Sequence, residues 1–400
     1  MKKIIKGLVV LIGVIILGVI LMAVFKLCPP VGPWPTPPWC TISEVSSKFT
    51  PEPLSYLPAV DNSQLNNSFM FGVGMMDLWG RLCTTPFTCD DPKEDIVKSF
   101  SRLKQIGTNL VMVTDFYQID RDKNIVNVTG GGARTISTED MKLLVDQAHA
   151  NNMKFMLMTN LFEKDKSRKV LNFANPTKQD LDHLFAEWKT KILTQAQKGQ
   201  YDYLVINPRD IAYFFEKQAD NDYMNNKFVS LIPELRQNYS GQICLWGPPG
   251  IINGFANQYD CLVVDDAINN ILQGADNNLG DITNKWQGYL NGITYNKPTF
   301  VLILMPSYDG ALTDGWIEPV GIHYGGDKYR PDYKVQALVY EGFFRAAANH
   351  PQIDGVISYG YWWNDRMYPN TLDIFRNDLS HSIRDKDAES VFYNWAQSAR

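Results

Sequence analysis

The chain has 400 residues, of which 45% are hydrophobic and 12% aromatic, and its formal net charge is −5 at pH 7. This composition supplies a large hydrophobic core and excludes a globally disordered chain. Without the four lysines among residues 1–26, the remainder carries −9 (−5 minus 4). No basic surface is therefore expected, and nucleic acid is not expected as a partner.

The N-terminal segment has the pattern of a signal anchor. Residues 7–25 are uncharged and lie between Lys6 and Lys26. A helix of that length spans about 30 Å, the thickness of the bilayer core, at 1.5 Å per residue. No small-residue cleavage site follows, so we predict an uncleaved transmembrane helix within residues 1–26. The lysines place the N-terminus in the cytoplasm and the rest of the chain outside the cell membrane. Secretion after cleavage of a signal peptide is the alternative.

Residues 27–66 are rich in proline. Proline favours extended backbone and excludes helix, so we predict a linker here. Trp34 and Trp39 within the linker could pack on the following domain. The remaining residues, 67–400, are predicted to form one domain.

The six cysteines form three pairs that are close in sequence: Cys28 with Cys40, Cys83 with Cys89, and Cys244 with Cys261. An even number in an extracytoplasmic chain favours disulfides, although six cysteines allow fifteen connectivities. The alternative for Cys244 and Cys261 is a pair of free thiols on neighbouring strands. The chain has no CxxC motif and only five histidines, so we expect no metal site, and we expect no cofactor.

An apolar run that ends in polar or aromatic residues recurs eight times within the domain. The predicted strands are residues 69–76, 109–114, 154–159, 204–206, 242–246, 261–264, 299–305 and 355–359. Segments with helical periodicity separate most of them, at residues 95–106, 180–197, 223–237, 282–290 and 333–349, and 388–399 follows the last strand. A further helix is predicted to begin at residues 137–140, and Gly107 is placed to stop the first helix.

Eight strands alternating with helices predict an α/β fold, a (β/α)8 TIM barrel that follows the transmembrane helix and the linker. The alternative is an open, doubly wound sheet. Such a sheet should carry a glycine-rich phosphate turn after a strand. The three glycines at residues 130–132 do not follow a strand directly, so the barrel is preferred.

Active sites in barrels of this kind are built at the C-terminal ends of the strands. These ends carry carboxylates, amides and large aromatic residues. Asp, Asn and Arg bind sugar hydroxyls, and Trp and Tyr stack on sugar rings, so the partner expected is a carbohydrate. The predicted substrate-binding residues are Trp79, Asp115, Tyr117, Asn160, Asn207, Arg209, Trp246, Tyr308, Tyr361, Trp362 and Trp363. Any one of them could instead be a packing residue or a helix cap.

Residues 67–400 resemble the clan A retaining glycoside hydrolases, and within them the β-mannanase-like barrels. The likeness lies mainly in Lys297-Pro298, in residues 330–350 (RPDYKVQALVYEGFFRAAANH) and in residues 355–365 (GVISYGYWWND). The resemblance implies an Asn-Glu pair after strand 4, a nucleophilic Glu after strand 7 and a Trp after strand 8. Asn207 matches the asparagine, and Trp362 or Trp363 matches the tryptophan.

This sequence departs from the family at both catalytic glutamates. Pro208 stands where the acid/base Glu belongs, and residues 302–306 (LILMP) contain no carboxylate. A glycosidase of this sequence would therefore use other acids, of which the best pair is Asp210 with Asp265 or Asp77. The alternatives are a non-catalytic carbohydrate-binding barrel and a surface scaffold or adhesin.

Overall fold

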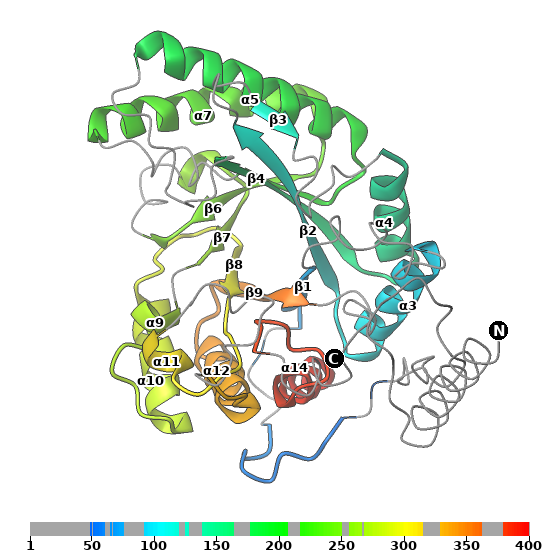
Figure 1. The fold of residues 1–400 in the computed structure, drawn as a ribbon, viewed down its shortest axis with the longest axis vertical. Coiled ribbons are helices and arrows are strands. Elements are labelled where there is room, and N and C mark those ends of the chain that lie inside the picture. The colour runs from blue at the N-terminus through cyan, green and yellow to red at the C-terminus, as the bar shows by residue number, and fades with distance from the viewer. Residues whose placement is uncertain are drawn as a thin grey trace, which may run out of the picture.

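The computed structural model describes residues 49, 51–60, 65, 67–75, 92–119, 125–127, 138–163, 177–206, 217–249, 256–265, 268–314, 329–361 and 379–399. A nine-stranded sheet closes into a barrel of parallel strands that helices surround (Figure 1). The barrel strands are β1 (Met70–Met75), β2 (Leu110–Ile119), β4 (Lys154–Glu163), β5 (Tyr203–Ile206), β6 (Gln242–Gly247), β7 (Cys261–Val264), β8 (Thr299–Ile303) and β9 (Ile353–Tyr361). Because β1 pairs with both β2 and β9, the barrel is closed, and the predicted (β/α)8 fold is confirmed.

Two barrel strands are longer than the sequence indicates. β2 and β4 are predicted to end at residues 114 and 159, but they end at Ile119 and Glu163. They pair with each other over their whole length, and the short strand β3 (Ile125–Asn127), which is not predicted, pairs antiparallel with the last part of β2. The added backbone hydrogen bonds keep the chain extended beyond the apolar runs.

Helices cover the outside of the barrel, as the helical periodicity predicts. They are α3 (Pro92–Gln105), α4 (Thr138–Ala150), α5 (Lys178–Lys198), α7 (Gln218–Asn238), α9 (Ile268–Ile271), α10 (Leu279–Asn291), α11 (Ala311–Asp314), α12 (Tyr333–Ala347) and α14 (Asp387–Ser398), with a 3-10 turn at Ala256–Gln258. Gly107 follows α3 with a φ of 88°, which glycine adopts without a steric penalty. α5 begins two residues before the predicted start because Thr177 and Asp180 form a capping box.

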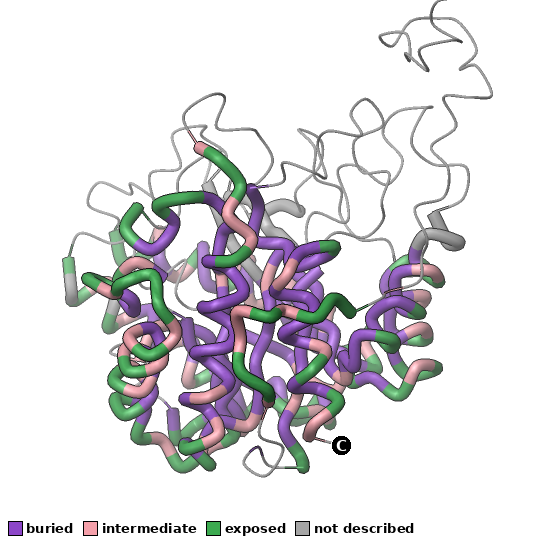
Figure 2. Tube along the Cα trace, turned by 90° about the horizontal axis from the view of Figure 1, so that it is seen from below, coloured by how far each residue is buried: buried purple, intermediate pink, exposed green. Residues whose placement is uncertain are grey.

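Buried apolar side chains form two clusters, one on each face of the sheet. The outer cluster lies between the strands and the helices, and both the strands and the helices contribute buried residues to it (Figure 2). The inner cluster fills the barrel and consists of Leu110, Met112, Met156, Met158, Val205, Cys244, Trp246, Cys261, Val263, Phe300, Leu302 and Ile357. The interior is tightly packed: at Gly72 an added Cβ atom would lie 2.7 Å from the carbonyl oxygen of Val356.

Cys244 and Cys261 form a disulfide across β6 and β7, with their Cα atoms 4.4 Å apart. This pairing is one of the three predicted, and it replaces the alternative of free thiols. The other four cysteines, Cys28, Cys40, Cys83 and Cys89, lie outside the described residues.

Part of the predicted linker packs on the outside of the barrel. The Phe49 N–H donates to Oε1 of Gln105, the last residue of α3, at 3.1 Å. The Tyr56 hydroxyl donates to Asp387 at the start of α14 at 2.6 Å, and Arg345 of α12 donates to the Pro58 carbonyl oxygen at 3.4 Å. Residues 49 and 51–60 therefore connect α3 with α12 and α14.

In the ranges that the structure describes, no helix is both long enough and apolar enough to cross a bilayer. The predicted anchor at residues 1–26 lies outside these ranges, and so does the linker up to residue 48.

Candidate functional site

The alternation of side chains along each strand decides which strand-end residues face the barrel interior. In β6, Cys244 and Trp246 belong to the inner cluster, and in β7 so do Cys261 and Val263. Asp265 follows Val263 at the same spacing and is 3% exposed. The alternation therefore places Trp246 and Asp265 on the interior side of two neighbouring strands.

Trp246 and Asp265 lie at the C-terminal end of the interior. Trp246 pairs with Val263 across the two strands, so Asp265 is one interior position nearer to the mouth. With about 4.8 Å between strands and about 3.3 Å per residue, their Cα atoms are roughly 8 Å apart. The Trp246 side chain is 8% exposed. An indole has a face on which a ligand can stack, and a carboxylate accepts hydrogen bonds. Both side chains are largely buried, so contact with a ligand would require an opening at the mouth.

Two further residues face the interior near this end and are absent from the predicted site. Thr114 follows Met112 of the inner cluster at the interior spacing, and its buried Oγ1 atom has no hydrogen-bond partner among the described residues. Tyr359 of β9 is partly buried against the inner cluster and pairs with Gly74 of β1. Both are the final residue of a strand predicted from the sequence, but the sequence does not show which face they occupy.

Asp115 does not face the interior, in contrast to the prediction that it lines the mouth. The neighbouring Val113 and Val111 belong to the outer cluster. The Asp115 carboxylate accepts a hydrogen bond from Nε2 of Gln195 in α5 at 2.7 Å. Burial and the charge of Asp115 together raise the pKa of the nearby Tyr201. Asp115 therefore belongs to the polar contacts between the sheet and α5.

Tyr361 and Tyr308 are also in the outer layer and not at the predicted mouth. Tyr361 is fully buried, and its hydroxyl donates to Oε1 of Glu389 in α14 at 2.6 Å. Burial, followed by the charge of Glu389, raises the pKa of Tyr361 well above its ordinary value. Tyr308 is fully buried and packs edge-on against Tyr329, with ring centroids 4.9 Å apart. Contact with a ligand would require both rings to leave these positions.

The Tyr361 hydroxyl contacts a buried ion pair between Arg102 and Glu389. Arg102 of α3 donates to both carboxylate oxygens of Glu389, at 3.2 and 2.6 Å, and to Asp385 at 2.6 Å. The side chains of Arg102 and Glu389 are 3% and 1% exposed. Because α3 is the first described helix and α14 the last, this network ties the two ends of the barrel together.

A lysine and a serine are close enough to suggest a nucleophilic pair. Nζ of Lys386 donates to Oγ of Ser307 at 2.9 Å and to the carbonyl oxygen of Ser380 at 3.0 Å. Some hydrolases activate serine in this way. Here Ser307 has no exposed surface and Lys386 is 5% exposed, so a substrate cannot reach the hydroxyl. The pair is a structural contact between the segment after β8 and the start of α14.

The structure leaves the other predicted site residues untested. Those outside the described residues are Asp77, Trp79, Asn207, Arg209, Asp210, Trp362 and Trp363. Tyr117 and Asn160 lie in the last parts of β2 and β4, at positions where only the backbone is described. The carboxylate separation that distinguishes retaining from inverting glycosidases therefore involves residues outside these ranges. Within the described part of the chain, no three His, Cys, Asp or Glu residues are grouped so that they could hold a metal ion.

No protein-family model matches the chain, and no curated protein matches its sequence. Its fold is similar to those of several solved glycoside hydrolases. The GH113 β-mannanase from Alicyclobacillus acidocaldarius, in complex with ManMIm, is 16% identical with a TM-score of 0.58 over 84% of this chain and 99% of that one. Another GH113 β-1,4-mannanase is 17% identical, with a TM-score of 0.56 over 82% and 99%.

A GH5_18 protein from Bifidobacterium longum, in complex with Manb1-4GlcNAc, is more distant. It is 12% identical, with a TM-score of 0.50 over 82% of this chain and 78% of that one. At such identities, the likeness establishes that the chain shares the TIM-barrel fold of these enzymes. It does not establish their chemistry.

Proposed function

We propose that the protein is a glycoside-hydrolase-like barrel that acts on a polysaccharide or glycan outside the cell membrane. The observation that carries the proposal is the register of β6 and β7, in which Trp246 is paired with Val263 and both belong to the inner cluster. From it we infer that Trp246 and Asp265 lie on the interior side of the two strands. An indole offers a sugar ring an apolar face, and a carboxylate accepts hydrogen bonds from its hydroxyls. The similarity in fold to GH113 β-mannanases and to a GH5_18 protein in complex with Manb1-4GlcNAc supports a carbohydrate as the partner.

Hydrolysis would need a second carboxyl group. Two carboxyls flank the bond in most glycosidases, and one must stay protonated while the other is ionised. We propose Asp265 as one of the pair and Asp210 or Asp77 as the other. The remaining predicted contacts, Asn207, Arg209, Trp362 and Trp363 among them, would then bind the neighbouring sugar units.

A non-catalytic carbohydrate-binding barrel is the second candidate. The sequence favours this candidate at the two positions where the β-mannanase-like family has its catalytic glutamates. Pro208 and residues 302–306 supply no carboxylate there. In this case Trp246 and Asp265 would bind a glycan that is not cleaved.

The test uses a panel of polysaccharides that includes β-mannans. Binding and the release of reducing ends are measured for the wild type and for Asp265→Asn and Trp246→Ala. Asp146→Asn serves as the control, because Asp146 is exposed and pairs with Lys142 of its own helix. Loss of a catalytic acid should lower the rate by about 10²–10⁴-fold. Loss of the indole should weaken binding.

The possible outcomes separate the candidates. Release of sugar that depends on Asp265 supports the hydrolase. Binding without release, weakened by Trp246→Ala, supports the binding barrel. If no glycan is bound and no sugar is released, both candidates are contradicted, and the scaffold or adhesin is the remaining one.

We further propose that residues 7–25 anchor the barrel in the cell membrane. The uncharged length between Lys6 and Lys26 is the basis of this proposal. The full chain should appear in the membrane fraction, and a chain lacking residues 1–26 should not. Recovery of a mature chain that begins after residue 26 would instead indicate a cleaved signal peptide and secretion.

A further inference from the structure

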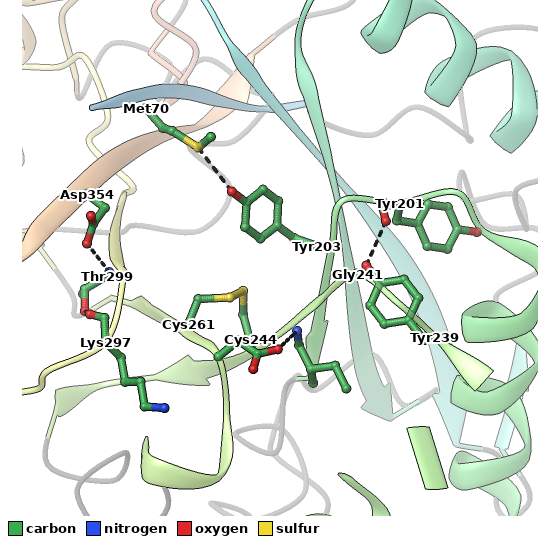
Figure 3. The surroundings of a disulfide bond; sticks show 12 residues. Met70, Tyr201, Tyr203, Tyr239, Gly241, Cys244, Cys261, Lys297, Thr299 and Asp354 are labelled. Carbon is green, nitrogen blue, oxygen red and sulfur yellow. Dashed lines mark hydrogen bonds between the residues drawn. A yellow bond between two sulfur atoms is a disulfide. The ribbon is translucent and has the colours of Figure 1, made fainter. Parts of the chain in front are cut away.

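The Cys244–Cys261 disulfide lies inside the barrel and not between the barrel and its helices (Figure 3). The two residues are directly opposite each other in the register of β6 and β7. Their exposed fractions are 0% and 1%. Both belong to the inner cluster, which contains residues from every barrel strand except β1.

Large side chains close the interior around the disulfide. Trp246 follows Cys244 by two positions toward the mouth and is 8% exposed. Toward the other end, the ring of Tyr203 packs edge-on against Phe300, with centroids 5.5 Å apart. The Tyr203 hydroxyl also donates to the sulfur of Met70 across the barrel at 3.6 Å (Figure 3). In the part of the chain that the structure describes, Cys244 and Cys261 have almost no exposed surface, so a thiol oxidant cannot contact either sulfur in the folded barrel.

Formation of the disulfide requires that an oxidant reach the sulfur of Cys244 or Cys261. A thiolate attacks one sulfur of an oxidant disulfide and forms a mixed disulfide, and the second thiolate then attacks the first cysteine and expels the oxidant as a thiol. The two cysteine thiols lose two electrons and two protons, and the oxidant disulfide accepts them and becomes two thiols. Neither attack can take place at a sulfur buried in a closed barrel.

We infer that the Cys244–Cys261 bond is made before the barrel closes, by thiol–disulfide exchange on a partly folded chain. The cysteines are only 17 residues apart. Two neighbouring strands with a short connection can meet early, because the entropy cost of closing a short loop is small. The subsequent closure of the interior then protects the bond from reductants.

The maturation of the protein would therefore include an oxidation step. The step requires a disulfide oxidant, either a protein oxidase or glutathione disulfide, and therefore an oxidising compartment. It does not depend on the proposed action on glycans.

The experiment compares two orders of addition with the full chain. A variant with Cys28, Cys40, Cys83 and Cys89 each replaced by Ser isolates the interior pair. The chain is unfolded and reduced, and it is then refolded either with glutathione disulfide present throughout or in reductant, with glutathione disulfide replacing the reductant afterwards. Thiols are alkylated under denaturing conditions, and mass spectrometry of the 244–261 peptides reports the bond.

The bond is expected to form when the oxidant is present during refolding. It is expected to be absent when the oxidant is added only after refolding. A reduced chain that fails to refold at all, as judged by circular dichroism, also supports the inference, because the bond then precedes the native barrel. Formation of the bond at the same rate in both orders would overturn it.

A second measurement starts from the oxidised native protein. Tris(2-carboxyethyl)phosphine should reduce the bond in urea and leave it intact in native buffer. Equal rates of reduction in both conditions, or the absence of the bond from the purified wild-type protein, would also overturn the inference.

Discussion

Asp202, at the start of β5, accepts a hydrogen bond from the backbone N–H of Phe155 in β4, with Oδ2 and N 2.9 Å apart. The same arrangement joins the other barrel strands in pairs: Asn109 accepts from Phe71 at 2.7 Å, Asp260 from Ile243 at 2.8 Å, and Asp354 from Thr299 at 3.0 Å. The Asp354–Thr299 contact is drawn in Figure 3. In each pair, a short polar side chain at the start of one strand satisfies an N–H at the start of the preceding strand. These contacts lie at the end of the barrel where stability, rather than chemistry, is expected.

Asp202→Asn should lower the thermal stability at neutral pH and have little effect in acid. Burial raises the pKa of Asp202, but hydrogen bonds from Lys154, the Phe155 N–H and His149 outweigh burial and lower it. A carboxyl with a lowered pKa stabilises the fold above its unfolded pKa of about 3.9, and this contribution is lost as the pH falls through the folded pKa. The Tm values of variant and wild type, measured across the acid range, should converge. A constant difference would contradict the assignment.

Asp354→Asn should have the opposite sign. Burial raises the pKa of Asp354, and the hydrogen bond from the Thr299 N–H offsets only part of the increase. A raised pKa means that the contribution to stability is present below the unfolded pKa and is lost as the pH rises through the folded pKa. The amide keeps an acceptor for Thr299 and carries no charge, so the variant should have the higher Tm at neutral pH. If Asp354→Asn and Asp202→Asn change the Tm in the same direction, the opposite pKa shifts assigned to the two carboxyls are wrong.

Glu389→Gln should destabilise the barrel strongly. Removal of one partner leaves the charge of Arg102 buried with only the half-exposed Asp385 beside it, and breaking such a pair costs about 3–5 kcal/mol. The measurement is the thermal midpoint, with Asp146→Asn as the control, because its exposed pair with Lys142 contributes little. Equal midpoints for the two variants would show that the network does not hold α3 to α14.

Removal of residues 1–66 should lower the thermal midpoint of the barrel more than removal of residues 1–48 does. Leu54, Tyr56, Leu57 and Val60 pack against the outer cluster. Tyr56→Phe should cost about 1 kcal/mol, because it removes the hydrogen bond to Asp387. Comparison of both truncated chains with the wild type by differential scanning calorimetry checks the prediction. Equal midpoints for the two truncated chains would show that residues 49–60 do not contribute.

Thr114→Val should preserve or raise the stability of the free protein and weaken glycan binding. The Thr114 hydroxyl is buried with no hydrogen-bond partner in the described part of the chain, and such a group is costly unless a ligand satisfies it. Loss of one hydrogen bond to a ligand corresponds to about 1 kcal/mol, or roughly fivefold in Kd. The Tm and the Kd for a bound glycan are measured on the same preparation. Unchanged binding would remove Thr114 from the site.

The sequence by itself determined the architecture of this protein. Alternating apolar runs and helical periods predicted the barrel and the bounds of β7 to the residue, and Gly107 predicted that α3 stops just before it. It also offered Cys244 with Cys261 as a pair. These features depend on local chemistry: apolar content, glycine conformation and spacing along the chain.

Only the tertiary structure decided which strand-end residues face the interior. Asp115 and Asp265 each follow a predicted strand by one residue, yet the first binds Gln195 among the helices and the second lies on the interior side. Parallel barrel strands are buried on both faces, so their sequences are continuously apolar and carry no alternation that separates inside from outside. The register of each strand against its neighbours supplies that information, and it exists only in the closed barrel.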